Sequence, residues 1–147
     1  MYGRLVNVPR LLASDRQDVV RHPVLEAAAH ALGTRYQCTF DCLHMALYRS
    51  GNDSIAMHQD KVKDPNASLV AILSLGQPRR FIVRPVIRNR TTARKRYRFA
   101  LGWGDLLLMG GSCQRDWEHG IPKVSHASPR MSIMFRQTGS KAMRYAS

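Results

Sequence analysis

Cysteine is scarce in this chain, and the 3 that occur, Cys38, Cys42 and Cys113, are odd in number and scattered. Such a set implies no disulfide framework. Cys38 and Cys42 are spaced like half of a zinc site, but nothing nearby supplies the other half. Ordinary thiols are therefore the favoured interpretation, with a zinc site as the alternative.

The chain also lacks any apolar run long enough for a transmembrane helix, and its first residues lack the basic and then apolar pattern of a signal peptide. We therefore expect a cytoplasmic protein with no membrane partner. A chain of 147 residues with 44% hydrophobic composition suffices for one domain, residues 1–147, that folds without disulfides or a structural metal. No internal repeat or low-complexity linker divides it, and a monomer is expected.

Acidic residues are few, since 10 Asp and Glu stand against 23 Lys and Arg and give a formal net charge of +13. An excess of this size on a short chain favours a polyanionic partner, because cationic side chains bind phosphates and release counterions. The alternative is a charged surface that only keeps the protein in solution, which is the usual explanation of a smaller excess. The sequence therefore predicts a nucleic-acid partner.

Hydrophobic periodicity predicts one helix followed by a series of short strands. Apolar residues recur with helical spacing after Pro23, and Gly33 is a natural stop, so the helix is expected at residues 22–32. Extended segments are expected at residues 43–49, 54–58, 69–75, 81–87, 94–101, 105–109 and 131–136. Short strands separated by turn residues predict a mainly β fold with a supporting N-terminal helix, and a double-stranded β-helix (jelly roll) fits best.

His58 and Asp60 form the first candidate for chemistry. Residues two apart on a strand point to the same face, so the pair could offer an imidazole nitrogen and a carboxylate oxygen to one point. His119, on a late strand, is the candidate for a third ligand. Two imidazoles and one carboxylate suit Fe(II) and leave positions for a bidentate co-substrate and O₂. A His-x-Asp pair alone is a weak signal, because surface hydrogen bonding explains it as well.

The segment from Arg130 to Arg136 is the second candidate. Both arginines and Ser132 share one face of the expected strand, and apolar residues fill the other face. A buried arginine needs an anionic partner, which a dicarboxylate such as 2-oxoglutarate could supply at each end. The alternative is an edge strand with two solvated arginines.

Taken in chain order, these patterns resemble the AlkB family of Fe(II)- and 2-oxoglutarate-dependent dioxygenases, over nearly the whole chain. The matching segments are residues 47–54 leading into His58-Gln59-Asp60, residues 73–76 with Arg79-Arg80-Phe81, residues 104–109, residues 117–123 and residues 130–136. This ordered series is far more specific than the His-x-Asp pair alone.

The resemblance implies that His58, Asp60 and His119 hold the iron and form the catalytic centre. It implies four residues that bind 2-oxoglutarate, namely Tyr48, Arg130, Ser132 and Arg136. Arg130 would pair with its distal carboxylate, a geometry that guanidinium supports well. The implied reaction uses Fe(II), O₂ and 2-oxoglutarate to oxidise an N-alkyl group on a base of DNA or RNA. Alkylated single strands or flipped-out nucleotides are the expected partners, because the base must leave its stack.

Three positions depart from the family pattern. Ala46 and Ser132 stand where the family commonly has Asn, and Val62 stands where repair members often have an acidic residue that contacts the base. A hydrogen bond lost at Ala46 weakens co-substrate binding by about 1 kcal/mol. Two alternatives stay open: the same oxidation of a substrate that is not a nucleic acid, and a non-catalytic nucleic-acid-binding relative.

Basic and aromatic side chains alternate within residues 79–99, which predicts a phosphate-binding groove. The alternative for residues 88–96 is a solvated hairpin loop. The N-terminal segment is shorter than the nucleotide-recognition lid of the family, which implies a reduced or truncated lid. A terminal tyrosine could stack on a base, or could simply pack. The expected nucleic-acid contacts are Arg79, Arg80, Tyr2 and Arg4.

Overall fold

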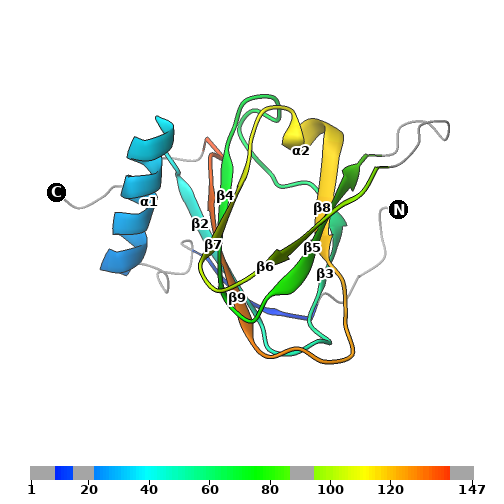
Figure 1. The fold of residues 1–147 in the computed structure, drawn as a ribbon. Helices are drawn as coiled ribbons and strands as arrows, with labels where there is room; N and C mark the ends of the chain where they lie inside the picture. Colours follow the sequence, from blue (N-terminus) through cyan, green and yellow to red (C-terminus); the bar gives the residue numbers. More distant parts are fainter. Residues whose placement is uncertain (1–8, 15–21, 87–94, 140–147) are drawn as a thin grey trace.

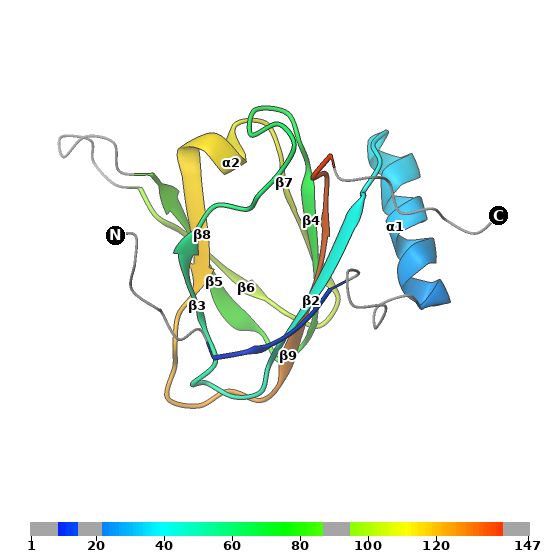
Figure 2. The same cartoon turned by 180° about the vertical axis from the view of Figure 1, so that it is seen from behind.

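The computed structural model describes residues 9–14, 22–86 and 95–139, and Figures 1 and 2 show the ribbon from opposite sides. The elements in chain order are β1 (Leu11–Ser14), α1 (Pro23–Tyr36), β2 (Cys42–Tyr48), β3 (Ile55–His58), β4 (Val70–Gly76), β5 (Arg79–Pro85), β6 (Tyr97–Leu101), β7 (Asp105–Met109), α2 (Cys113–Asp116), β8 (Trp117–Ile121) and β9 (Arg130–Arg136). In this described part of the chain, no helix is long and apolar enough to span a membrane.

The strands form two antiparallel sheets that face each other (Figure 1). One sheet has the order β1-β2-β9-β4-β7 and the other has the order β3-β8-β5-β6. From β2 onward the chain passes from one sheet to the other and back, as it does in a double-stranded β-helix. The predicted mainly β jelly roll with a supporting helix is therefore confirmed.

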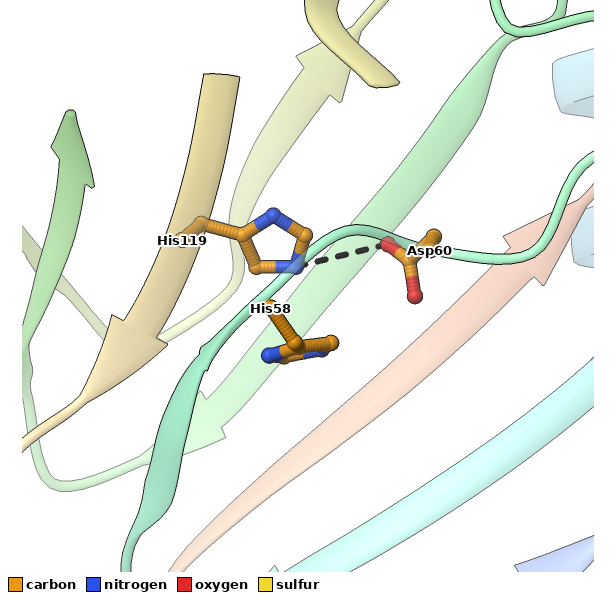
Figure 3. Close-up of side chains that lie close together, drawn as sticks. All are labelled: His58, Asp60 and His119. Atoms are coloured by element: carbon orange, nitrogen blue, oxygen red, sulfur yellow. Dashed lines mark ion pairs between the residues drawn. The ribbon is translucent and has the colours of Figure 1, made fainter. Parts of the chain in front are cut away.

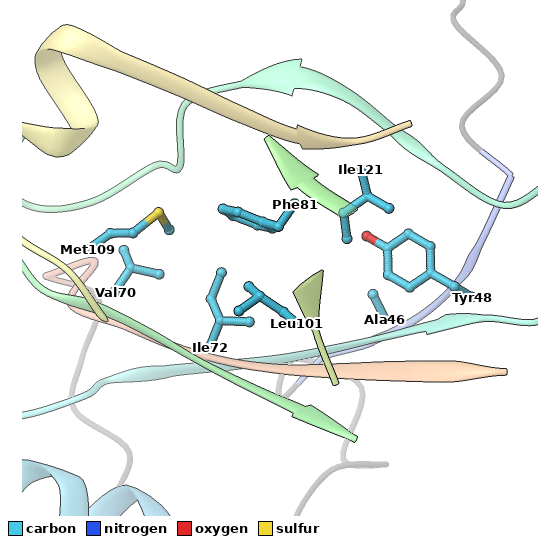
Figure 4. Packing of buried hydrophobic residues seen from close by; sticks show 8 residues of the cluster. All are labelled: Ala46, Tyr48, Val70, Ile72, Phe81, Leu101, Met109 and Ile121. Carbon is cyan, nitrogen blue, oxygen red and sulfur yellow. The ribbon is translucent and has the colours of Figure 1, made fainter. Parts of the chain in front are cut away.

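Strand β9 lies in the middle of the larger sheet, between β2 and β4. Its residues alternate between the two faces of the sheet, as the period of a strand requires. Arg130 and Ser132 stand opposite Tyr48 and Ala46 of β2, on the face that looks into the roll. The roll interior is filled by the buried side chains drawn in Figure 4, Ala46, Tyr48, Val70, Ile72, Phe81, Leu101, Met109 and Ile121.

Helix α1 covers the outer face of the larger sheet, as both ribbon views show (Figures 1 and 2). A second apolar cluster seals this contact, with Ala29, Phe40, Leu43, Ala71, Ile133 and Phe135 as its buried members. Because β9 carries Met131, Ile133 and Phe135 toward the helix and both Arg130 and Ser132 into the roll, a single strand supports both the fold and the site.

The helix begins where the sequence predicts but ends later. The Val24 N–H donates to Nδ1 of His22, 3.3 Å away, and Pro23 occupies the first turn. The prediction that Gly33 ends the helix is wrong, because Gln37 is the residue that turns left-handed, with φ of 53°. Gly33 instead gives room for the returning chain, since a Cβ there would lie 2.7 Å from the Cys38 carbonyl oxygen.

Candidate metal and co-substrate site

The structure brings together the three residues predicted to hold a metal (Figure 3). His58 is the last residue of β3, and His119 stands directly opposite it on β8. Asp60 follows just after the strand ends, and its Oδ2 lies 3.4 Å from Nε2 of His119. One ligand atom from each residue lies within 4.8 Å of the other two. The three can therefore reach one ion.

The tautomer of His58 is fixed by its own strand. Its Nδ1 lies 2.9 Å from the carbonyl oxygen of Ala56, and a carbonyl can only accept, so Nδ1 carries the proton. The lone pair for a metal is therefore on Nε2. Burial, followed by the nearby His119, lowers the pKa of His58. At neutral pH the ring is thus uncharged and free to bind a cation.

Asp60 is ionised, and one of its carboxylate oxygens is available to bind a metal. Burial raises the pKa of this carboxyl, but His119 and the charge of Arg136 outweigh burial and hold the pKa at about 2. Arg136 places Nη2 2.7 Å from Oδ1, while Oδ2 is buried without a hydrogen-bond partner among the described residues. A lone carboxylate oxygen beside two imidazoles fits a divalent metal of the first transition row.

Gln114 in α2 anchors the segment that carries Asp60, a role that the sequence did not reveal. The Asp60 N–H donates to Oε1 of Gln114 at 2.8 Å, and Nε2 of Gln59 donates to the Gln114 carbonyl at 2.8 Å. The Gln114 residue is 4% exposed. A single glutamine between Cys113 and Arg115 has no periodicity or motif, and only its place shortly before His119 could have drawn attention to it.

Arg130 is a buried cation without a carboxylate partner. It is 1% exposed, and its guanidinium donates to the Leu101 carbonyl at 3.1 Å and to hydroxyl oxygens of Ser132 and Ser74 at 2.5 and 2.6 Å. In the described part of the chain, no acidic side chain forms an ion pair with it. Burial lowers the pKa of Arg130 to about 10, so it remains charged at neutral pH.

Tyr48 lies directly opposite Arg130 in the β2–β9 pairing, with its ring 5.5 Å from the guanidinium carbon. Tyr48 is 3% exposed, and burial raises the pKa of its phenol. The hydroxyl therefore stays protonated and can donate a hydrogen bond. The Ser132 hydroxyl accepts from Arg130, so it orients the guanidinium in addition to facing the interior. Two of the predicted co-substrate residues are thus gathered around Arg130.

Arg136, the fourth predicted co-substrate residue, lies at the other end of β9. Besides its ion pair with Asp60, its Nη1 contacts Nδ1 of His44. His44 was not singled out by the sequence, since nothing near it in the chain suggests a partner. Arg136 therefore links the metal ligand to the larger sheet.

Comparison with known proteins decides the family. A family model described as the 2OG-Fe(II) oxygenase superfamily matches residues 12–145. The chain belongs to this superfamily. Its His58, Asp60 and His119 form a group that could hold the Fe(II) for which this superfamily is named.

Two curated relatives confirm the resemblance to the AlkB family. The Alpha-ketoglutarate-dependent dioxygenase alkB homolog 3 of Homo sapiens is 34% identical over an alignment of 123 positions, and the match covers 78% of this chain and 42% of that protein. The DNA oxidative demethylase ALKBH2 of Homo sapiens is 30% identical over an alignment of 121 positions, and the match covers 78% of this chain and 46% of that protein. The chain thus spans less than half the length of either relative.

A solved structure shows the same fold. The 2OG-Fe(II) oxygenase family oxidoreductase from Burkholderia pseudomallei has a TM-score of 0.55 and 19% identity, with 97% of this chain and 64% of that chain covered. At that identity the likeness concerns the fold alone.

In this member of the superfamily, Arg79 does not fit the nucleic-acid contact expected of it. Arg79 is 3% exposed, and its guanidinium donates to the carbonyl oxygens of Ser50, Asp53 and Pro122 at 2.9, 3.0 and 2.9 Å. It therefore holds two loops together inside the protein. Sequence reasoning failed because a basic stretch does not reveal which arginines turn inward.

The other predicted nucleic-acid contacts have different positions. Arg80 is exposed and points away from the interior, next to Arg79 on β5. Tyr2 and Arg4 lie outside the described residues, as does most of the loop expected at residues 88–96. Arg80 is thus the predicted contact that the structure leaves available at the surface.

The departures from the AlkB pattern affect the interior of the roll. Ala46 is buried opposite Ser132, so a methyl group stands where an amide would offer hydrogen bonds. Val62 packs partly buried against the inner cluster.

Of the described residues, the only group able to hold a metal is His58, Asp60 and His119, so the alternative zinc site at Cys38 and Cys42 gains no support.

Proposed function

We propose that this chain is an Fe(II)- and 2-oxoglutarate-dependent dioxygenase that removes N-alkyl groups from nucleobases of DNA or RNA. The observation that carries the proposal is Arg130, a buried cation without a carboxylate partner in the described chain, inside the same roll as the His-Asp-His cluster. The printed names of two relatives, a dioxygenase and a DNA oxidative demethylase, support it.

Iron held by His58, Asp60 and His119 would supply, with 2-oxoglutarate and O₂, the oxidation of a carbon attached to nitrogen. The side chains prepare this chemistry. His58 offers a neutral nitrogen, and His119 together with Arg136 keeps Asp60 ionised. For an N-methyl base, the overall change consumes 2-oxoglutarate and O₂ and yields the unmethylated base, formaldehyde, succinate and CO₂.

Arg130 would bind the distal carboxylate of 2-oxoglutarate through its guanidinium, which forms strong bidentate pairs with carboxylates. Tyr48 would donate from its neutral phenol beside it. Arg130 and Tyr48 are both buried, so little water reaches the pair. In such a dry environment, the attraction between guanidinium and carboxylate is stronger than at the surface.

A nucleic-acid substrate is supported by charge and access. The net charge of +13 attracts phosphates. His58 is half-buried, whereas Asp60 and His119 are buried, so the substrate would approach from the side of His58. A base inside a duplex cannot reach a centre within a roll, and single strands or flipped-out bases are therefore the proposed substrates.

The test incubates the purified chain with Fe(II), 2-oxoglutarate and a single-stranded oligonucleotide that contains one N-methylated base. Mass spectrometry should show both the unmethylated oligonucleotide and an equal amount of succinate. Asp60→Ala should abolish both products. Glu26→Ala removes a carboxylate from α1, on the far side of the larger sheet, and serves as the control that keeps activity.

Val62 favours a second candidate, the same oxidation of a substrate that is not a nucleic acid, because no acidic residue stands there to contact a base. Succinate formed with a small-molecule or protein substrate, but not with any methylated oligonucleotide, would select this candidate. Folded protein that binds nucleic acid and forms no succinate at all would indicate a non-catalytic relative.

A further inference from the structure

A pocket of about 270 Å³ lies next to the proposed metal centre but contains none of its ligands. Its lining comes from β5, β6, the first residue of β8 and the segment that leads into α2, and Figure 1 shows where these elements lie. We call it the β6 pocket, and its lining residues are Val83, Tyr97, Phe99, Gly110, Ser112, Cys113 and Trp117. Neither the metal site nor the co-substrate site uses them.

The β6 pocket shares a wall with the metal centre. Val83 stands opposite His119 in the β5–β8 pairing, and Phe99 stands opposite Phe81 in the β5–β6 pairing. The ring of Phe81 stacks on His119, with 5.2 Å between centroids. A ligand in the pocket would therefore be separated from His119, a proposed iron ligand, by one layer of side chains.

Aromatic rings dominate the lining and remain accessible. Tyr97 is 39% and Phe99 is 40% exposed, which leaves much of their surface uncovered. The rings of Tyr97 and Trp117 are 5.6 Å apart and tilted by 50°. Rings that present open faces at one place form a stacking platform for a flat partner.

The charges around the rings select an anionic partner. The ammonium group of Lys95 lies 5.3 Å from the centroid of Tyr97 and places a positive charge beside the rings. Arg98 projects from the opposite face of β6, because side chains alternate along a strand, and Arg96 lines another pocket. No acidic side chain is among the residues that line the pocket. A flat ring attached to a phosphate combines both features, whereas an apolar peptide would leave Lys95 without an anionic partner.

We propose that the β6 pocket binds an unpaired nucleobase of the substrate strand, next to the base that is demethylated. The inference rests on the proposed function, because it makes the pocket a second subsite for the same strand. Its size fits one ring system, since pockets for larger organic ligands usually exceed about 300 Å³. Stacking tolerates any base, so the pocket would add affinity without sequence selectivity.

Tryptophan fluorescence tests occupancy without altering the pocket. The chain has 2 tryptophans, and Trp103, 77% exposed in the turn between β6 and β7, does not line the pocket. Trp103→Phe leaves Trp117 as the sole reporter. Unmethylated oligo-dT and oligo-U of equal length should quench Trp117 with the same midpoint that fluorescence anisotropy gives for binding, and the two arms separate DNA from RNA.

Steady-state kinetics test the contribution to the reaction. Tyr97→Ala and Phe99→Ala should each raise KM for a methylated oligonucleotide on the order of tenfold with kcat retained, because each removes a stacking surface. KM for a methylated mononucleotide should not change, because it has no neighbouring base. Leu106→Ala is the matched control, since Leu106 is 41% exposed on an outer strand and does not line the pocket.

The outcomes separate this inference from the proposed function. Demethylation by the wild type with unquenched Trp117, or with unchanged KM in both β6 variants, overturns the pocket inference and leaves the function standing. Quenching without demethylation supports the pocket as a base-binding site and contradicts the function. Absence of both oligonucleotide binding and demethylation overturns both.

Discussion

Gln114 offers a sharp test of how the metal ligands are held in place. Its side-chain oxygen accepts the buried Asp60 N–H at 2.8 Å, and its backbone carbonyl accepts from Gln59. Gln114→Met preserves the length of the side chain and removes the acceptor. Only the bond to the Asp60 backbone is then lost, because the carbonyl of residue 114 remains.

The structure allows the magnitude to be worked out from two opposing contributions. A buried N–H left without an acceptor costs about 1–3 kcal/mol. The Nε2 of Gln114 is itself buried without a hydrogen-bond partner among the described residues, so its removal offsets part of that cost. We expect a net loss of about 1 kcal/mol, which lowers Tm by about 2–4 °C in a chain of this size.

We expect Gln114→Met to reduce metal affinity more than it reduces the free energy of unfolding. Contacts that orient metal ligands are typically worth about 10- to 100-fold in affinity, and Asp60 would lose the bond that fixes its backbone. Isothermal titration calorimetry with Mn(II), a redox-stable substitute for iron, measures this loss directly. Gln114→Glu keeps an acceptor oxygen and should retain most of the affinity, and Gln77→Met replaces an exposed glutamine as the control.

The reasoning would be refuted by a Gln114→Met protein that binds Mn(II) as the wild type does while its Tm falls. Gln114 would then stabilise the fold without positioning Asp60. Equal losses of affinity in the methionine and glutamate variants would also contradict it, because the two variants differ in the acceptor on which the argument depends.

Three further predictions concern other charged side chains. Arg130→Met should abolish the rise in Tm that 2-oxoglutarate produces in the Mn(II)-loaded protein, because the buried cation that would hold its distal carboxylate is gone. Arg79→Ala should lower the free energy of unfolding in urea by about 3 kcal/mol or more, since three carbonyls lose a charged donor. In metal-free protein, the pKa of Asp60 is about 2 when folded against an ordinary 3.8. Because the folded pKa is lower than the unfolded one, the ionised Asp60 contributes up to about 2 kcal/mol to the free energy of unfolding above pH 4. This contribution is lost as the pH falls toward 2. Asp60→Asn should therefore flatten the pH profile of stability in that range.

Local sequence signals predicted most of the secondary structure. The buried segment at residues 69–75 and the run at 105–109 follow from continuous apolar residues between turn residues, and both are strands. The end of α1 was predicted wrongly because a glutamine, Gln37, adopts the left-handed conformation that usually favours glycine. Gly33 lies inside the helix, where the following chain packs against it at Cys38. Helix α2 was missed, since a single turn carries no periodicity.

The candidate site was only partly accessible from the sequence. The spacing of His58 and Asp60 follows from strand geometry, because residues two apart share a face. The pairing of His58 with His119 joins distant segments, and only the ordered motifs indicated it. The anchoring of Asp60 by Gln114 is a long-range contact with no motif at all. Contacts that depend on tertiary packing therefore could not be predicted from the sequence.

Three arginines near the roll interior show why residue type alone could not assign roles. Arg79 donates to backbone carbonyls, and Arg136 is paired with Asp60. Arg130 has only hydroxyl and carbonyl oxygens around it, and these offset a buried charge less completely than a carboxylate does. Arg130→Met should destabilise the unliganded protein by less than Arg79→Ala does, because two of the three oxygens around Arg130 belong to hydroxyls that can turn to other partners, whereas all three around Arg79 are backbone carbonyls. A clearly smaller loss of unfolding free energy in Arg130→Met than in Arg79→Ala would separate an arginine kept for a ligand from one kept for the fold, and equal losses in the two variants would contradict the assignment of Arg130 to 2-oxoglutarate.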